Sequence, residues 1–487
     1  MVATLAPQSA TRRARLTPAQ MYDRLLASDA GFNGRFFVGV LSTGIFCLPS
    51  CHARKPRREN VQFFPTADEA RAAGLRPCLK CHPEDFARGA DPVLETIEAV
   101  VGEVRANPAA FPDVRAIVRR AGFGTTRVFE LFRQHYHTTP ADLLLRARLA
   151  MVREKLNTTD DPLASIAYDA GFRALSAFHE NFRRLHGLTP TAWRDLRTAH
   201  TFEIELPAGY PLGYLRRALS RDPHSVTERL SGDTYTTVVA LEGAPTTLEL
   251  RLSKKAVQAT ISRGSAIEAH RAVAGLLGLD QDAAAFSRLA KRLGLARLVR
   301  AREGMRISQT HSVWDGLLWS IIGQQINFPF ACLLRSRLVA RVGEQLGNGL
   351  FTPPTPQAVA GLKMEDLLPL QFSRQKARYV IDTARLVASG ELDLEALRTM
   401  SATRAERTLL AVRGLGPWSV NYLMMRSLGF ADCLPLGDTG VTSGLRALFK
   451  LDERPGADAT RRLISAFSPF RSLATAHLWQ LNQPIPT

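Results

Sequence analysis

Two tight pairs of cysteines constrain the N-terminal part of this 487-residue chain more than any other feature. Cys47 and Cys51 are separated by three residues, and Cys78 and Cys81 by two. Two close pairs of this kind can surround one Zn²⁺ with four sulfurs in a tetrahedron. We therefore predict a zinc site ligated by these four cysteines, with Zn²⁺ as the cofactor.

Spacing alone leaves two alternatives open at this site. His52 and His82 each follow a cysteine and are alternative ligands, although both stand outside the pairs. Four thiolates around Zn²⁺ carry a formal charge of about −2, and electron-rich sulfurs of this kind stay nucleophilic at neutral pH. A purely structural zinc site, however, has the same cysteine spacing.

The residues around the cysteines favour a reactive site. They closely resemble the zinc domain of Ada-type methyl-phosphotriester repair proteins across residues 18–88. The match is clearest in three runs: 37–51 (FVGVLSTGIFCLPSC), 59–64 (ENVQFF) and 73–81 (AGLRPCLKC). The resemblance implies that Cys47 irreversibly accepts a methyl group from a DNA phosphotriester. We predict an Ada-type zinc-binding methyl-acceptor domain over residues 15–90, with Arg54 and Arg57 contacting DNA phosphates.

Methylation of Cys47 has an electrostatic consequence. A thiolate becomes a thioether, so the site loses one negative charge and its repulsion from the DNA backbone falls. We therefore expect methylation to tighten DNA binding and to activate the chain as a transcription regulator.

An internal repeat follows the cysteines. The run AGFGTTRVF at 121–129 and the run AGFRALSAF at 170–178 each follow a helical pattern and each lead to a Thr-Pro pair. A glycine at a short turn between two helices is typical of a helix-turn-helix, whose second helix enters the major groove. Apolar periodicity over 143–156 predicts a helix that joins the two motifs.

The repeat resembles the AraC/XylS-type DNA-binding domain over nearly all of residues 91–200. The resemblance implies recognition helices at about 125–134 and 174–185, promoter recognition, and RNA polymerase as a partner. Arg127 and Arg173 are candidate DNA contacts; for each arginine, an exposed and solvated charge is the alternative.

Residues 201–310 are predicted to form a small α+β platform domain. Polar and apolar residues alternate in four segments, which is typical of an antiparallel sheet: 201–206, 234–241, 246–252 and 257–262. Helices are predicted at 265–277 and 284–292, and no residue of this region stands out as catalytic.

A glycine-rich turn joins two helical patterns near residue 414. Gly414 and Gly416 allow backbone conformations closed to other residues, and Pro417 suits the first position of a helix. This pattern predicts a helix–hairpin–helix, in which both glycines lie at the DNA and the free N–H groups of the second helix bind a phosphate without recognising sequence.

Aromatic residues and one carboxylate follow the hairpin. Trp418 and Tyr422 are four residues apart and share a helix face, and Asp438 comes after them. This order resembles the helix–hairpin–helix DNA glycosylases, in particular the AlkA-type branch, which the runs 314–325 and 477–479 also fit. The resemblance implies a glycosylase domain over residues 311–487, preceded by the platform domain.

The implied reaction is hydrolysis of an N-glycosidic bond after the damaged nucleotide is flipped out of the stack. Electron-rich rings hold a cationic alkylated purine, and the four predicted rings are Trp418, Tyr422, Trp479 and Trp314. Asp438 is predicted to stabilise the developing oxocarbenium sugar as an ionised catalytic residue. A helix N-cap is the alternative for Asp438, and core packing is the alternative for the tryptophans.

Other features narrow the class of glycosylase. Lyase-type relatives carry a Schiff-base lysine where this chain has Trp418, so a monofunctional enzyme of the DNA-3-methyladenine glycosylase II type is predicted. Gln325 occupies the position of an apolar wedge in the best-known AlkA-type enzymes, which leaves its wedge role open. The resemblance also implies an alkali ion at the hairpin carbonyls.

The overall charge fits a nucleic-acid partner. The formal net charge is +18, and together with the motifs it favours double-stranded DNA, both damaged and promoter, over a generally basic composition. No apolar run approaches the length of a membrane span, and no secretory signal is recognised. We expect a cytoplasmic, nucleoid-associated monomer without a membrane partner.

The sequence thus predicts a multidomain, mainly α-helical chain with a small α+β part that repairs alkylated DNA and regulates the response to it. The first alternative is a transcription factor whose glycosylase half binds DNA without catalysis. The second is a glycosylase whose front half only targets it to DNA.

Overall fold

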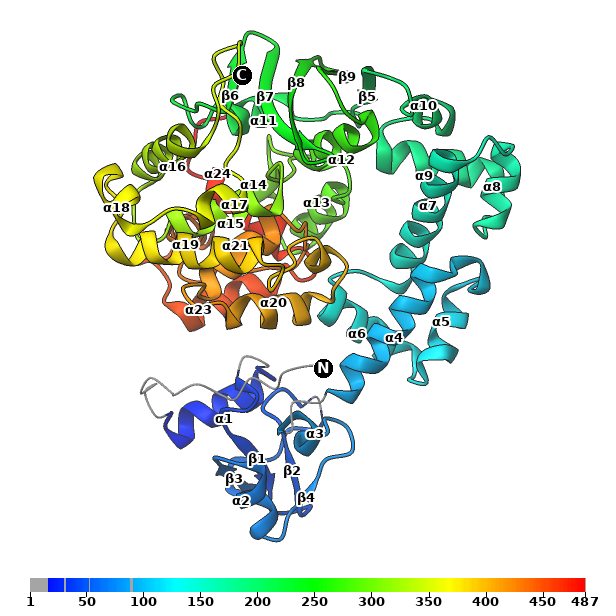
Figure 1. The fold of residues 1–487 in the computed structure, drawn as a ribbon. Helices are drawn as coiled ribbons and strands as arrows, with labels where there is room; N and C mark the ends of the chain where they lie inside the picture. The colour runs from blue at the N-terminus through cyan, green and yellow to red at the C-terminus, as the bar shows by residue number, and fades with distance from the viewer. Residues whose placement is uncertain (1–15, 30–31, 52, 88–90, 487) are drawn as a thin grey trace. The chain divides into compact units, whose positions relative to one another are not determined.

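A computed structural model describes residues 16–29, 32–51, 53–87 and 91–486 (Figure 1). The chain divides into two compact units, residues 1–99 and residues 100–487. Among the described residues, no helix is both long and apolar enough to cross a membrane.

The first unit is a small sheet with short helices, and no part of this sheet was predicted. Its strand order is β3-β1-β2-β4, antiparallel except between β2 and β4. The elements are α1 (Pro18–Leu26), β1 (Phe37–Val40), β2 (Ile45–Cys47), β3 (Val61–Phe64), α2 (Ala67–Ala72), β4 (Arg76–Pro77) and α3 (Pro83–Ala87). Phe37, Phe46 and Phe64 fill its core.

The helical repeat forms two helix-turn-helix motifs, as predicted. Its elements are α4 (Pro92–Ala106), α5 (Val114–Ala121), α6 (Thr125–Tyr136), α7 (Pro140–Thr158), α8 (Leu163–Asp169), α9 (Leu175–His186) and α10 (Pro190–Asp195). Each motif turns at a glycine with a left-handed backbone, Gly122 at φ +71° and Gly171 at φ +90°. The recognition helices α6 and α9 extend one or two residues beyond the predicted ends.

The platform is a five-stranded antiparallel sheet of order β5-β9-β8-β7-β6. Its elements are β5 (Thr201–Glu205), α11 (Leu212–Leu219), β6 (Glu228–Ser231), β7 (Thr234–Leu241), β8 (Ala244–Leu252), β9 (Ala256–Ile261), α12 (Ala266–Leu277) and α13 (Ala283–Arg292). The four predicted strands are present, whereas α11 and β6 were missed.

The platform does not have a core of its own. Phe178, Phe182 and Trp193 of the second helix-turn-helix motif pack in one cluster with Tyr235 and Val257 of the sheet. The predicted boundary at residue 200 therefore lies inside a continuous hydrophobic core rather than between two independent ones.

The remaining helices surround a second large core. They are α14 (Ala296–Val299), α15 (Val313–Ile322), α16 (Phe328–Val342), α17 (Pro356–Ala360), α18 (Met364–Leu367), α19 (Arg374–Ala388), α20 (Ala402–Ala411), α21 (Pro417–Arg426), α22 (Thr439–Phe449), α23 (Ala457–Ser465) and α24 (Arg471–Gln480). The observed chain is mainly α-helical with two small sheets, which confirms the predicted fold class.

Candidate active sites

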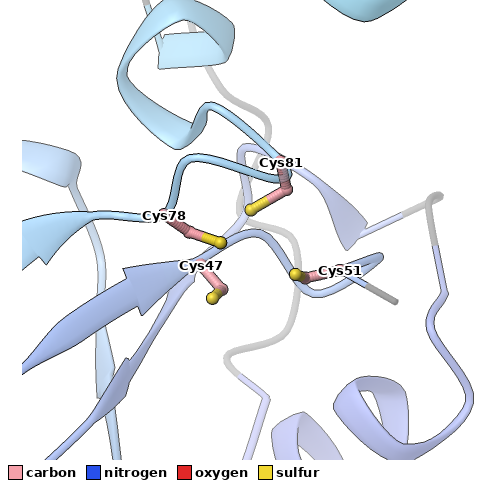
Figure 2. A group of neighbouring side chains, drawn as sticks. All are labelled: Cys47, Cys51, Cys78 and Cys81. Carbon is pink, nitrogen blue, oxygen red and sulfur yellow. The ribbon is translucent and has the colours of Figure 1, made fainter. Parts of the chain in front are cut away.

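The four paired cysteines come together in the first unit (Figure 2). Cys47 ends strand β2, Cys78 directly follows β4, and the parallel pairing of these strands brings the two cysteines together. All four Sγ atoms lie within 4.8 Å of one another. Four sulfurs at the usual Zn–S distance of about 2.3 Å are roughly 3.8 Å apart in a tetrahedron. The donor set and its spacing therefore fit Zn²⁺.

The sulfurs differ in their hydrogen bonds. The Leu48 N–H donates to Cys81 Sγ at 3.3 Å, and the Lys80 N–H donates to Cys78 Sγ at 3.4 Å. Hydrogen bonding with the Cys47 thiol lowers the pKa of Cys51 to about 7, and the Ala53 backbone lowers it to a smaller extent. Among the described residues, no backbone N–H donates to Cys47 Sγ.

The structure tests one of the two histidines that were alternative metal ligands. His52 lies outside the described residues. The His82 ring lies 3.4 Å from the Asp85 carboxylate rather than with the four sulfurs.

Lys55 donates from Nζ to the Cys51 carbonyl at 2.7 Å, which holds a positive charge near the sulfurs.

The predicted DNA-contacting arginines are accessible. Arg54, Arg57 and Arg173 are exposed, and Arg127 near the start of α6 is half-buried. Arg57 forms a long ion pair of 3.8 Å with Glu59, and Arg127 forms one of 3.2 Å with Glu130. Exposed pairs of this kind contribute little stability, so they leave these side chains free to change partners.

The C-terminal end of recognition helix α6 packs against α20. His135 Nδ1 lies 2.9 Å from Thr403 Oγ1, and His137 Nδ1 accepts the Asp432 N–H at 3.1 Å. Burial lowers the pKa of His137 to about 4. The ring is therefore neutral at pH 7, which its acceptor role requires.

The predicted hairpin joins α20 to α21. Gly414 has φ +94°, and a Cβ at this position would lie 2.5 Å from the Tyr379 ring, so both conformation and space require glycine. Gly416 differs from the prediction: its φ of −95° is open to any residue, and it serves as the extended N-cap before Pro417. This arrangement leaves the first N–H groups of α21 outside the helical hydrogen bonds.

Asp438 is held by three donors in the second unit. The indole N–H of Trp418 donates to Oδ2 at 3.0 Å, and the indole N–H of Trp479 donates to Oδ1 at 2.9 Å. The N–H of Val441 also donates to Oδ1 at 2.9 Å, which makes Asp438 the N-cap of α22. The two interpretations of Asp438 are therefore compatible, because one carboxylate caps the helix and also binds two tryptophans.

Three aromatic rings line this carboxylate. Trp418 and Tyr422 stack with centroids 5.3 Å apart and planes 19° apart, and Tyr422 and Trp479 lie 6.2 Å apart. All three rings are half-buried. Gly440 leaves room for Trp479, since a Cβ there would lie 2.6 Å from that indole.

Trp314 is not brought together with the other three rings. Its residue is 8% exposed within the helical core, and its indole N–H donates to the Pro354 carbonyl at 2.9 Å. The core-packing alternative therefore describes Trp314. The side chain faces inward because α15 is apolar on nearly every side.

Gln325 lies at the tip of the turn between α15 and α16, exposed and with φ +57°. The preceding residue anchors this turn: Gln324 Nε2 donates to the Gly414 carbonyl at 2.8 Å and to Ser419 Oγ at 2.9 Å. Lys376 donates from Nζ to the carbonyls of Ile322 and Gln324. Neither anchor was predicted from the sequence, in which a lysine on the apolar face of α19 is the one indication.

Three family models match the chain. They are the metal binding domain of Ada at residues 20–84, a helix-turn-helix domain at residues 117–195, and the HhH-GPD superfamily base excision DNA repair protein at residues 318–469. The three predicted parts with recognisable motifs are therefore present, in the predicted order.

Relatives and a solved structure agree with these models. The probable bifunctional transcriptional activator/DNA repair enzyme AlkA of Mycobacterium tuberculosis strain H37Rv is 27% identical over 489 residues, which covers 95% of this chain and 96% of that protein. The DNA-3-methyladenine glycosylase of Bacillus subtilis is 32% identical over 207 residues, which covers 42% of this chain and 68% of that protein. The 3-methyladenine DNA-glycosylase structure from Archaeoglobus fulgidus has a TM-score of 0.52 at 23% identity, covering 58% of this chain and 99% of that one, which shows a shared fold. This chain therefore belongs to the DNA-3-methyladenine glycosylase family within the HhH-GPD superfamily, and it also carries an Ada-type metal-binding domain and a helix-turn-helix domain.

Proposed function

We propose that this chain repairs alkylated DNA and regulates the response to it. In this proposal, the second unit hydrolyses the N-glycosidic bond of alkylated bases of the 3-methyladenine type, and the first unit accepts methyl groups from DNA phosphotriesters. The observation that carries the proposal is Asp438, held by Trp418 and Trp479 beside Tyr422 and close in sequence to a phosphate-binding hairpin.

The aromatic group supplies recognition. A base carrying a positive charge gains cation–π attraction from the rings of Trp418, Tyr422 and Trp479, which a neutral base does not. Gln325 is positioned to fill the gap that the flipped nucleotide leaves, because its turn is anchored to the hairpin that binds the neighbouring phosphate.

Asp438 supplies the catalytic charge. Three N–H donors hold the carboxylate in place, where it can face the positive charge that develops on the sugar as the base departs. The alkylated base is already a good leaving group and needs little acid assistance. The same carboxylate orients the attacking water.

We propose hydrolysis without strand cleavage. A lyase needs an amine that attacks the sugar, and the position of that amine after the hairpin is Trp418 here. Burial lowers the pKa of Lys376 to about 8, but its amine donates to the carbonyls of Ile322 and Gln324 and is occupied in holding the turn. An alkali ion at the hairpin stays a prediction, and the Gly414 carbonyl already accepts the Gln324 amide.

The sulfur site supports methyl acceptance at Cys47. When bound, Zn²⁺ holds the four cysteines as thiolates, which remain nucleophilic. Backbone N–H groups draw electron density from Cys81 and Cys78, whereas no N–H of the described backbone donates to Cys47, so Cys47 keeps more electron density than those two. Cys47 is only 7% exposed, so the substrate methyl group must approach its sulfur through a narrow opening.

Regulation follows from charge. Methylated Cys47 no longer repels the DNA backbone, and the two recognition helices then hold the promoter with RNA polymerase as the partner. The transcription-factor alternative keeps these contacts but predicts no base release.

Base release from a methylated duplex tests the proposal. We expect wild-type protein to release alkylated bases without nicking the strand, and Asp438→Asn to reduce the rate by roughly a hundredfold or more. Asparagine caps helices as well as aspartate does, so this variant removes the charge and keeps the cap. The exposed Asp452→Asn variant is the matched control. A wild-type protein that binds DNA but releases no base would establish the transcription-factor alternative.

A second assay follows labelled methyl transfer from phosphotriester DNA. We expect one methyl group per wild-type chain and none for Cys47→Ala. Transfer to a different cysteine in the wild-type protein would move the acceptor role from Cys47.

A further inference from the structure

The two recognition helices carry an arginine at the same position. Each ends at a left-handed C-cap, His137 after α6 and Gly187 after α9. The C-cap N–H donates to the carbonyl of Arg133 in α6 and of Arg183 in α9, so the two arginines are equivalent, and both are exposed. The N-terminal residues of a recognition helix contact base edges. An arginine near the other end is therefore placed to contact the flanking phosphates.

The two arginines differ in their partners. Within the described parts of the chain, no carboxylate pairs with Arg133. Arg183 donates from Nε to Glu205 Oε2 at 2.6 Å and from Nη2 to Glu205 Oε1 at 2.8 Å. A bidentate pair of this kind is stronger than the single contact between Arg127 and Glu130. The second recognition helix thus presents an arginine that is already paired.

Glu205 belongs to the platform, and the backbone holds it beside α9. It is the last residue of β5, and its N–H donates to the Gly187 carbonyl at 2.8 Å. A Cβ at Gly187 would lie 2.6 Å from the Ile204 side chain, so the strand lies directly against the end of α9. The hydrophobic core that the second motif shares with the platform holds both elements together. The carboxylate is therefore a fixed neighbour of Arg183.

A groove of about 600 Å³ lies beside this ion pair. It is lined by residues of α9 that include Arg183 and Arg184, by the start of α10, and by residues 205–207 of the platform. The groove has room for a phosphate group of the DNA backbone. A phosphate that enters it meets the Glu205 carboxylate as well as the Arg183 guanidinium, and the two charges act on it in opposite directions.

We propose that the platform restrains the second recognition helix: Glu205 holds the Arg183 guanidinium away from the DNA backbone, so the second motif makes one phosphate contact fewer than the first. This inference rests on the proposed promoter binding. A residue of the glycosylase half thereby sets how tightly the regulatory half binds DNA.

The experiment measures DNA affinity of the full chain at several salt concentrations. The probe is an unmethylated duplex that the wild-type chain selects from a random-sequence library, so it carries no lesion for the glycosylase. Glu205→Thr removes the carboxylate at an exposed strand position, which suits threonine. Glu203→Thr is the matched control, because Glu203 is exposed on the same face of β5 and removes the same charge.

We expect Glu205→Thr to tighten binding about threefold and to steepen the slope of log K against log salt by about 0.9, because one phosphate contact is gained. Glu203→Thr should have a clearly smaller effect on both. Arg133→Gln should weaken binding by the wild-type chain about threefold, whereas Arg183→Gln should leave it nearly unchanged. In the Arg183→Gln background, Glu205→Thr should gain no more than Glu203→Thr.

Three outcomes would overturn the inference and leave promoter binding intact. Equal gains for Glu205→Thr and Glu203→Thr would show a general charge effect. Weakening of the wild-type chain by Arg183→Gln, as large as that by Arg133→Gln, would show that Arg183 already contacts DNA. A gain for Glu205→Thr that persists without Arg183 would show that the carboxylate acts through another group. If the wild-type chain selects no duplex, the proposed promoter binding fails, and this inference fails with it.

Discussion

The sulfur site and the Asp438 site differ in how the chain assembles them. Four cysteines from two short segments of one small sheet form the first site. The second site brings together Trp418, Asp438 and Trp479, which come from three separate helical segments and are joined by indole N–H bonds. We expect the first site to depend on a bound metal ion for its stability, whereas the second depends on long-range packing. The two sites should therefore fail under different conditions, and four predictions test this difference.

Metal removal should have the largest effect, and it should affect one site only. Zinc binding contributes roughly 10–16 kcal/mol in small metal-dependent domains, more than the whole stability of most domains. We expect a strong chelator to unfold the first unit and abolish methyl transfer, while base release stays unchanged. Circular dichroism and the two activity assays check this expectation. A parallel loss of base release would show that the second unit depends on the first.

The indole N–H bonds to Asp438 should come next. Trp479→Phe keeps an aromatic ring but removes one charged hydrogen bond, which is worth roughly 1.5–3 kcal/mol. We expect kcat for base release to fall about tenfold or more.

Trp314→Phe is the matched control for that prediction. Its indole N–H donates to the Pro354 carbonyl in the core, so its loss should lower stability by roughly 1–3 kcal/mol and leave kcat unchanged. If Trp314→Phe lowered kcat as much as Trp479→Phe, the distinction between pocket ring and core ring would be wrong.

The same contrast explains what the sequence could predict. Cysteine pairs predict a metal site because ligands that are close in the chain are also close in space. The glycine at 414 predicts a backbone conformation that other residues rarely adopt. Trp314 and Trp479 look equivalent in sequence, and only the packing of α15 separates them. The contact of Arg221 with the rings of Trp319 and Phe328 was not predicted, because these residues are distant from Arg221 in the chain. The shared core around Trp193 and Tyr235 was missed for the same reason.

Acid should weaken the second unit through a third mechanism. Burial lowers the pKa of His137 to about 4, below its ordinary value of 6.5. The unfolded chain therefore binds a proton below pH 6.5, while the folded chain does not until about pH 4. Stability falls as pH drops through this window, by roughly 1.4 kcal/mol per pH unit at most for one histidine.

His137→Asn should reduce that pH dependence. Asparagine tolerates the left-handed backbone of this position, where φ is +54°, and its carbonyl can still accept the Asp432 N–H. Denaturant unfolding at pH 7 and pH 5 should show a smaller loss of stability than in wild type. The exposed His200→Asn should behave like wild type, and equal slopes for all three proteins would refute the assignment to His137. Burial also lowers the pKa of His270 and His477 to about 4, so some acid sensitivity remains.

The smallest effect on activity is expected for a substitution at Gln325. This substitution distinguishes the two sites by their reactions rather than by their stability. Phosphotriester repair needs no base flipping, whereas base release does. Gln325→Ala should lower base release about threefold from a fully paired duplex, because the gap in the stack is filled less well, and should leave methyl transfer unchanged. The exposed Gln357→Ala is the control. The loss of base release should be smaller when the lesion lies opposite a mismatched base, because the stack is already weakened there. An equal loss in both duplexes would mean that Gln325 does not act as the wedge.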